Sequence, residues 1–525
     1  MPQVLTLAEQ HRQAGRLAEA RDLLEQVVKA QPRHPEALHL LGVVLHQAGD
    51  WAGAIDMVQR AIAVNGRMPL YYSNLGEMLR LTGRLDEAVA AGRRAVELSP
   101  RYAQALNNLG IAHYDRREYE EAAGYYRRAV AAEPRFAEAF SNLGNALRAQ
   151  HKLEDAIVAY HRALELKPDF PDAVANLASV LHLIGRLDEA IATYSRAIAM
   201  SPRHANAHSG LGLLQLLRGD FTQGWWEYEW RWRSADAVAP NLPSPVWGGE
   251  SLVGRRILIY SEQGYGDALQ FCRYAPILRD RGATVFLRVP PPLRSLMAES
   301  MPWLEVSSDG KGGLPKHDCH CALLSLPHRL ETRLETIPAE IPYLRASPDR
   351  VARWSASIDA SADLKVGIVW AGSTRHINDV NRSIPLTSLA SWFEIDGIRF
   401  FSLQVGDAAA AVNALPKQAV TDLSPLLTDY AETAAAVEHL DLVVSVDTSV
   451  VHLAGALGKP VWTLLPWIPD WRWLENREDT PWYPTMRLFR QPERFAWSPV
   501  LARVAGELAA ARDDRGRLAP AGRAS

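Results

Sequence analysis

Small and apolar residues recur along the first 233 residues with a fixed step of 34. A leucine followed by a small residue marks each step: Leu7-Ala8, Leu41-Gly42, Leu75-Gly76, Leu109-Gly110, Leu143-Gly144, Leu177-Ala178 and Leu211-Gly212. Alanines keep the same step further along each unit, and a proline ends most units. Small residues at fixed points on two helices let the helices approach closely. The pattern therefore predicts an all-α superhelix of seven antiparallel helix pairs over residues 1–233.

A 34-residue step is typical of the tetratricopeptide repeat. Four successive units carry an asparagine just before the Leu-small pair, and we expect all four on one line at the edge of the concave groove. An amide both donates and accepts hydrogen bonds, which suits it to holding the backbone of an extended peptide. The alternative is an asparagine that is merely frequent and solvated at this repeat position. These residues are Asn74, Asn108, Asn142 and Asn176.

The repeats also resemble those of O-GlcNAc transferase, in stretches such as residues 170–181, FPDAVANLASVL. That resemblance implies that the asparagines hold an acceptor protein ahead of a catalytic half. The last repeat ends in an aromatic run, residues 224–233, which predicts a capping helix docked on the next domain. Residues 234–253 are rich in proline and glycine and predict a linker.

Beyond the linker, short apolar runs alternate with helical periods, a pattern typical of α/β folds. It predicts one parallel domain over residues 254–350, a second over 351–511, and a disordered tail over 512–525. In the second domain, the buried run Leu442–Val446 leads directly into Asp447-Thr448-Ser449, residues that cap helices. A helix start presents unpaired N–H groups and a positive dipole end, so a phosphate would bind beside Thr448 and Ser449. An ordinary capped turn of a doubly wound domain is the alternative.

The run from Asp447 through His452 to Pro460, DTSVVHLAGALGKP, resembles the donor-site signature of the bacterial lipopolysaccharide heptosyltransferase family. The resemblance implies the GT-B fold, in which two Rossmann-like domains hold a nucleotide-sugar between them. It further implies that Asp447 contacts the donor, that Thr448 and Ser449 contact its phosphates, and that His452 faces the site. The third position of the motif is usually glycine in that family and is Ser449 here.

Three more residues are candidates for the same site. In the first domain, Asp267 follows a glycine turn at the end of a strand, where open sheets bind ligands, and the resemblance makes it the candidate catalytic base. Its alternative role is that of a helix cap. Arg382 stands where the family usually has a phosphate-binding lysine, and a solvated surface arginine is its alternative. Gln404 ends a strand that faces the same cleft, and we expect it to reach the donor base.

Composition narrows the function classes. A net charge of −3 gives no bulk electrostatic case for binding nucleic acid or an anionic membrane surface. No apolar run is long enough to span a bilayer, no signal-peptide core is visible, and three cysteines suit a reducing compartment, so the sequence predicts a cytoplasmic protein. Neither metal nor cofactor is expected, because residues 317–321, HDCHC, lack the spacing of a zinc site and no Asp-x-Asp motif stands beside the donor motif.

These features favour a metal-independent GT-B glycosyltransferase that moves a sugar from a nucleotide-sugar to a hydroxyl of an acceptor protein held in the groove. The nearest resemblance implies inversion of the anomeric centre, and the layout is similar to that of bacterial flagellin glycosyltransferases. Two alternatives stay open: the acceptor is a lipopolysaccharide or another surface saccharide, or the chain is a scaffold whose transferase half is inactive. The aromatic loop at residues 467–484 either stacks on substrate or packs the two domains together.

Overall fold

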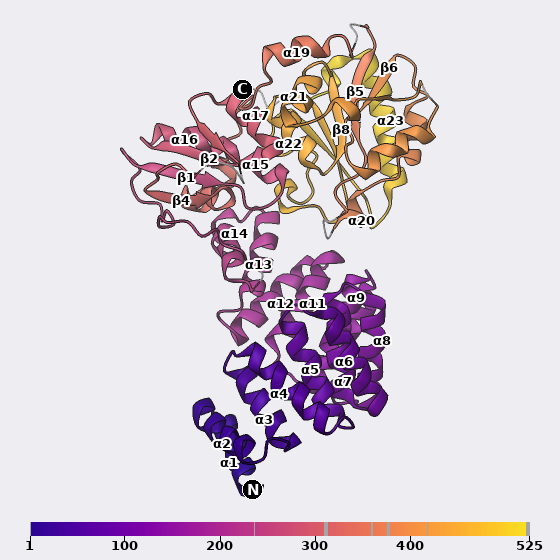
Figure 1. The fold of residues 1–525 in the computed structure, drawn as a ribbon. Coiled ribbons are helices and arrows are strands. Elements are labelled where there is room, and N and C mark those ends of the chain that lie inside the picture. Colours follow the sequence, from indigo (N-terminus) through magenta and orange to yellow (C-terminus); the bar gives the residue numbers. More distant parts are fainter. Residues whose placement is uncertain are drawn as a thin grey trace. The chain divides into compact units, whose positions relative to one another are not determined.

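A computed structural model describes residues 2–235, 237–308, 313–358, 361–374, 378–416 and 418–520 (Figure 1). The chain divides into two compact units, residues 1–204 and 205–525.

The first unit is a stack of antiparallel helix pairs, coloured indigo to purple in Figure 1. The small residues of the 34-residue step explain how closely the helices pack: a Cβ atom added at Gly110 or Gly144 would lie 2.6 Å from the ring of Tyr126 or Tyr160, respectively. The helices are α1 (Pro2–Gln13), α2 (Leu17–Ala30), α3 (Pro35–Gln47), α4 (Trp51–Val64), α5 (Pro69–Leu81), α6 (Leu85–Leu98), α7 (Ala103–Asp115), α8 (Tyr119–Ala132), α9 (Ala137–Ala149), α10 (Leu153–Leu166), α11 (Pro171–Leu183) and α12 (Leu187–Met200).

The second unit begins with the seventh helix pair, α13 (Ala205–Leu217) and α14 (Phe221–Tyr228), which continues as the 3₁₀ turn η1 (Glu229–Arg233). This pair packs on the α/β part of the unit. The indole N–H of Trp225 donates to the carbonyl of Thr332 at 3.0 Å, and Phe221 stacks on Trp482 with ring centroids 6.1 Å apart. The boundary between compact units therefore falls one repeat before the 34-residue pattern ends.

The first α/β half contains a four-stranded parallel sheet in the order β3-β2-β1-β4. Strands β1 and β4 flank the point where the strand order reverses, and open sheets bind ligands at the carboxyl ends of the strands there. The elements are β1 (Arg256–Tyr260), α15 (Tyr265–Phe271), α16 (Ala275–Asp280), β2 (Thr284–Arg288), α17 (Pro291–Ser300), β3 (Glu305–Ser307), β4 (Cys319–Ala322) and α18 (Leu326–Arg329).

The second α/β half contains a six-stranded parallel sheet in the order β10-β9-β8-β5-β6-β7, the doubly wound order, with its switch point between β5 and β8. Helices α15 and α22 pack against each other between the two sheets (Figure 1). The elements are α19 (Pro348–Trp354), β5 (Leu364–Val369), α20 (Asp379–Arg382), β6 (Ile398–Ser402), β7 (Thr421–Asp422), α21 (Tyr430–Glu438), β8 (Leu442–Val446), α22 (Ser449–Ala456), β9 (Val461–Leu465), β10 (Met486–Arg490) and α23 (Trp497–Asp513).

The expected fold class, a helical repeat superhelix followed by an α/β half with parallel sheets, is confirmed. The expectation of a disordered tail from residue 512 is wrong as far as residue 518. Helix α23 runs to Asp513, the turn Arg515–Arg517 follows, and Leu518 is buried where its carbonyl accepts a 2.9 Å hydrogen bond from Trp462 Nε1. Apolar contact with the second sheet orders this segment despite its polar composition.

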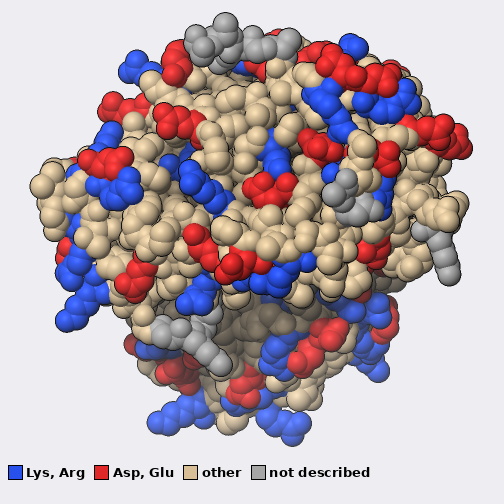
Figure 2. All heavy atoms as spheres, turned by 90° about the horizontal axis from the view of Figure 1, so that it is seen from above, with Lys and Arg blue, Asp and Glu red and all other residues tan. Residues whose placement is uncertain are grey.

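Two surface properties bear on function. Among the residues that the structure describes, no helix is both long enough and apolar enough to cross a membrane. On the face drawn in Figure 2, acidic and basic side chains are interspersed. The described part of that face therefore presents mixed charge, in keeping with the small net charge of the chain.

Candidate functional site

Asp447 lies at the switch point of the second sheet, directly after β8. Its Oδ2 accepts a hydrogen bond from Trp473 Nε1 at 2.9 Å, and its carbonyl oxygen accepts one from Arg382 Nη1 at 2.8 Å. Arg382 is oriented in turn by Asp379, whose Oδ1 lies 3.2 Å from Nε. Burial raises the pKa of Asp447 to about 6, with the charge of Asp470 acting in the same direction. Arg382 therefore lies beside the candidate donor motif and holds its backbone.

The two hydroxyls at the start of α22 have different partners. Ser445 Oγ donates to the carbonyl of Val446 at 2.6 Å and lies 3.1 Å from Thr448 Oγ1, so the proton in that second bond comes from Thr448. Thr448 Oγ1 also accepts from the N–H of Val450 at 3.4 Å, as an N-cap. The proton of the Thr448 hydroxyl is thus committed to the fold, and its contribution to an anion site would come from the helix start that it caps.

Ser449 Oγ, by contrast, lies 2.6 Å from the hydroxyl of Tyr430 on α21. Burial raises the pKa of Tyr430 to about 12, so the phenol keeps its proton at neutral pH and can donate it to Ser449. The Ser449 proton is then available to a ligand in front of the helix. Nothing local in the sequence indicates this pairing, because the two residues stand on different helices.

His452 does not face an open site. It is 5% exposed, stacks on Trp473 with ring centroids 5.4 Å apart, and its Nδ1 lies 3.0 Å from the hydroxyl of Tyr483. Burial, with the nearby arginines, holds the pKa of His452 well below its usual value, so the ring is neutral. A Cβ atom at Gly266 would lie 2.8 Å from His452 Cδ2, so glycine at 266 permits α15 to approach α22 this closely. His452 therefore packs the two halves against each other.

Asp267 both caps a helix and forms an ion pair. Its Oδ2 accepts a 2.7 Å hydrogen bond from the N–H of Gly264 at the start of α15, and its Oδ1 pairs with Arg472. Arg472 Nε also donates to Gln270 Oε1 at 2.6 Å, and its Nη1 to Asp470 Oδ1 at 2.7 Å. The Asp267 side chain is 16% exposed, so solvent reaches it only partly.

One short turn, η8 (Trp471–Trp473), links the candidate residues of the two halves. Arg472 holds Asp267 of the first half, and the adjacent Trp473 holds Asp447 of the second half. The structure thus ties the two aspartates to adjacent residues of one turn. Arg472 was not singled out by sequence reasoning, since its only signal was its place inside an aromatic run.

Gln404 is buried, at 4% exposed, and both ends of its amide have backbone partners. Its Oε1 accepts from the N–H groups of Trp370 and Ala371 at 3.2 and 2.9 Å, and its Nε2 donates to the carbonyl of Val405 at 3.1 Å. Gln404 therefore shapes the loop after β5. A contact with the donor base stays a prediction, and it would require exchange of one of these bonds.

The aromatic loop at residues 467–484 packs the two halves together. Trp471, Trp473 and Trp482 are each at most 4% exposed. Trp482 contacts Phe271 of the first half with ring centroids 5.7 Å apart, and its carbonyl accepts a 2.8 Å hydrogen bond from Arg273 Nη1. The open question about this loop is therefore resolved in favour of packing for these three rings.

In the first unit, the asparagine line forms bonds between neighbouring repeats. The Nδ2 atoms of Asn74, Asn108 and Asn142 lie 2.8, 3.2 and 3.0 Å from His39 Nε2, Ser73 Oγ and Asn107 Oδ1, respectively. Each partner is a buried residue 35 positions earlier. All four asparagines, Asn176 included, are half-buried, and their place at the edge of a groove stays a prediction.

No group of three or more His, Cys, Asp or Glu side chains in the described part of the chain could hold a metal ion. In the HDCHC segment, Cys319 and Cys321 are free and buried. Two surface hollows of about 330 and 590 Å³ lie elsewhere, one beside Arg256 and His317 and the other beside Arg345 and His439. Neither hollow is lined by a candidate site residue.

Comparison with known families also separates the helical repeats from the α/β part of the chain. The profile of glycosyltransferase family 9 (heptosyltransferase) matches residues 397–466, from β6 to the end of β9. Tetratricopeptide repeat profiles match residues 5–65, 67–132, 107–169, 141–202 and 184–228. The chain thus joins tetratricopeptide repeats to a segment that matches the family 9 profile.

Protein FlbA of Caulobacter vibrioides is 27% identical over 322 residues, which cover 56% of this chain and 53% of that protein. The chain therefore spans about half the length of this curated relative. Among solved structures, the Cut9–Hcn1 assembly of APC/C is 20% identical, covers 40% of this chain and 42% of that one, and has a TM-score of 0.38. The type IV pilus biogenesis factor PilW is 20% identical. The match covers 40% of this chain and 96% of that chain, with a TM-score of 0.37.

Proposed function

We propose that the second unit transfers a sugar from a nucleotide-sugar donor to a hydroxyl group of a protein that the repeats bind. The observation that carries the proposal is that adjacent residues of η8 contact Asp267 and Asp447, and that Asp447 lies in the segment that matches the family 9 profile. A carboxylate facing a helix start supplies a base for the incoming hydroxyl and charge stabilisation for the departing phosphate.

In this proposal the donor diphosphate binds at the start of α22, where the helix N–H groups, the Ser449 hydroxyl and Arg382 stabilise its charge. The acceptor oxygen attacks the anomeric carbon from the opposite side, so a new carbon–oxygen bond forms as the bond to the phosphate oxygen breaks. The nucleoside diphosphate leaves, the hydroxyl proton passes to Asp267, and the anomeric configuration inverts. Arg472 orients the carboxylate before it accepts the proton.

We propose further that no metal takes part, because the helix start and Arg382 together offset the charge of the leaving diphosphate. Transfer should then be insensitive to a chelator, and its loss in EDTA with recovery on adding Mg²⁺ or Mn²⁺ would contradict this part of the proposal. The compartment that we propose is the cytoplasm, since the three buried cysteines are free thiols.

The asparagine line supports a protein acceptor. Its regular spacing along four successive repeats fits an extended chain, and an amide can bond to a peptide backbone without selecting a side chain. A protein acceptor with Ser or Thr in an exposed segment is the expected substrate class, a surface protein such as flagellin among them.

The test is a screen of purified chain against candidate acceptor proteins and labelled nucleotide-sugars. Label on a Ser or Thr of a protein is the expected result, and Asp267→Asn should lower the rate of labelling by about 10² to 10⁴. The variant Asp470→Asn is a matched control, because Asp470 also binds Arg472 but is 38% exposed. Transfer to a saccharide or lipid and to no protein would remove the protein acceptor, and binding of partners without any transfer would favour the scaffold.

A further inference from the structure

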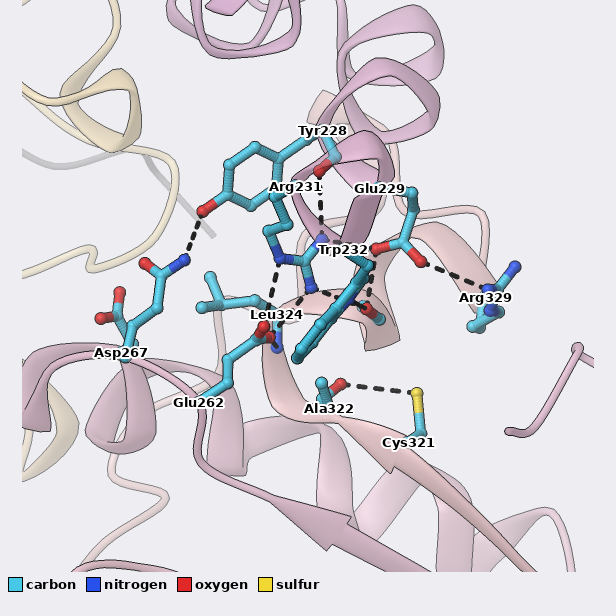
Figure 3. A network of polar contacts seen from close by, with 12 residues as sticks. Tyr228, Glu229, Arg231, Trp232, Glu262, Asp267, Cys321, Ala322, Leu324 and Arg329 are labelled. Atoms are coloured by element: carbon cyan, nitrogen blue, oxygen red, sulfur yellow. Dashed lines mark hydrogen bonds and ion pairs between the residues drawn. The ribbon is translucent and has the colours of Figure 1, made fainter. Parts of the chain in front are cut away.

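The switch point of the first sheet is occupied by a side chain of the protein itself. The loops after β1 and β4 diverge there, and in open sheets such a crevice holds a ligand. Figure 3 shows the guanidinium of Arg231, from η1, lying between these loops. Its Nε and Nη2 donate to the two oxygens of Glu262 at 3.1 and 2.9 Å, and Nη2 also donates to Ser325 Oγ at 2.7 Å. One side chain therefore bridges both loops.

A second contact fixes the next residue of the same loop. The hydroxyl of Tyr228 accepts a 2.8 Å hydrogen bond from Gln263 Nε2, and the Tyr228 ring lies 4.6 Å from the Arg231 guanidinium carbon. Glu229 accepts from Arg231 and from Ser325, each at 2.7 Å. Residues 262 and 263 are thus both held by the end of the seventh helix pair.

This network is buried and its charges are matched. The side chains of Arg231 and Glu262 are 10% and 6% exposed. A bidentate arginine–carboxylate pair is geometrically specific, and removing one partner leaves a buried charge without compensation. The loop should therefore change its position, or open to water, if the guanidinium is lost.

The anchored loop leads directly to the candidate base. Gly264, the residue after Gln263, donates its N–H to Asp267 Oδ2 at 2.7 Å, which fixes the carboxylate relative to the loop. We propose that Arg231, supported by Tyr228, is a positioning residue for Asp267, so that the end of the repeat array sets the orientation of the acceptor-side carboxylate. This inference rests on the proposed function.

The proposal predicts that loss of the Arg231 guanidinium lowers turnover but leaves the affinity for the donor nearly unchanged. Asp447, Thr448 and Arg382 lie in the second α/β half, whereas Arg231 contacts a loop of the first half. Arg231→Met should therefore lower kcat by about tenfold to a hundredfold, as a displaced catalytic group does, while the affinity for a nucleoside diphosphate stays within about twofold. Arg231→Lys should give a smaller loss, because an ammonium can pair with Glu262 but cannot reproduce the fork.

The experiment compares wild type, Arg231→Met, Arg231→Lys and Arg233→Met in the full-length chain. Arg233 is a matched control, since it lies on the same turn and its guanidinium stacks on Trp230 at 4.2 Å. Three quantities are measured: binding of ADP, GDP and UDP by calorimetry, turnover with the donor and acceptor found in the transfer screen, and hydrogen exchange of residues 261–268. Arg231→Met should speed exchange in that segment and lower kcat, and Arg233→Met should do neither.

Unchanged exchange at residues 261–268 in Arg231→Met would overturn the inference, as would faster exchange with unchanged kcat. If Arg231→Met does not fold, Arg231→Lys decides by the same two readouts. If wild type transfers no sugar, the proposed function fails separately. In that case, hydrogen exchange of residues 261–268 alone decides whether Arg231 anchors the loop.

Discussion

A carboxylate follows a strand at the switch point of each sheet, but the two carboxylates have different partners. Glu262, in the loop after β1, accepts hydrogen bonds from Nε and Nη2 of Arg231. Asp447 in the second sheet receives an indole N–H, while the neighbouring Arg382 binds its backbone oxygen. Burial raises the pKa of both carboxyl groups. The first switch point is thus filled by the chain itself, and the second retains the charge and helix start that suit an external ligand.

The largest effect should come from removing the element that fills the first switch point. A chain that begins at Ala205 should fold, whereas one that begins at Ser234 lacks α13, α14 and Arg231 and should not. The shorter chain exposes the rings that Phe221 and Trp225 contact, and it removes the guanidinium partner of Glu262. Thermal unfolding monitored by circular dichroism measures this, and equal melting of the two chains would contradict it.

The next effect tests whether the two aspartates have different roles. Asp267→Asn keeps a side chain that can cap α15 but cannot accept the proton, so turnover should fall by about 10² to 10⁴ with nucleotide binding preserved. Steady-state kinetics and calorimetry measure the two quantities. An equal fall in Asp470→Asn would show that the loss comes from disturbing Arg472 instead.

A smaller effect should appear in the pH dependence of stability. Because the folded-state pKa of Asp447 is raised to about 6, the folded chain binds this proton more tightly than the unfolded chain does. The protonated carboxyl group of Asp447 therefore stabilises the folded chain at pH values below the pKa that it has in the unfolded chain. This contribution to the free energy of unfolding, about 1–3 kcal/mol, is lost as the pH rises through about 6. Urea unfolding of wild type and Asp447→Asn between pH 4 and 7.5 measures it: the stability difference between the two should change across this window, and a constant difference argues against the raised pKa.

The smallest effect concerns the hydroxyl pair at the start of α22. Tyr430→Phe removes the donor to Ser449 and should weaken binding of ADP, GDP or UDP about twofold to tenfold. In a Ser449→Gly background the same change should have no effect, because the partner is gone. Calorimetry on wild type, the two single variants and the double variant gives a double-mutant cycle. Additive losses of binding free energy would mean that Tyr430 does not act through Ser449.

Local pattern was enough to predict the fold and to single out the candidate donor motif. The 34-residue step, the run Leu442–Val446 and the cap at Thr448 are each encoded in a few neighbouring residues. Asp267 was also found locally, from its glycine turn. The boundary of the second unit was not, since the seventh helix pair follows the same step as the other six and differs only in what it packs against.

The residues that sequence reasoning missed act across long sequence separations. Arg472 reaches Asp267 across 205 positions, and Arg231 reaches Ser325 across 94. Tyr430 is only 19 positions from Ser449, yet its helix had no polar pattern that indicated a partner. Such contacts are set by how the sheets and helices pack, so no spacing within a single element predicts them.

Gly266 allows α15 and α22 to lie in close contact. A methyl group there would collide with the imidazole ring of His452, so any larger residue would force α15 away from α22. In the proposed reaction, the absence of one side chain thus determines how near the attacking oxygen can come to the carbon that it must reach.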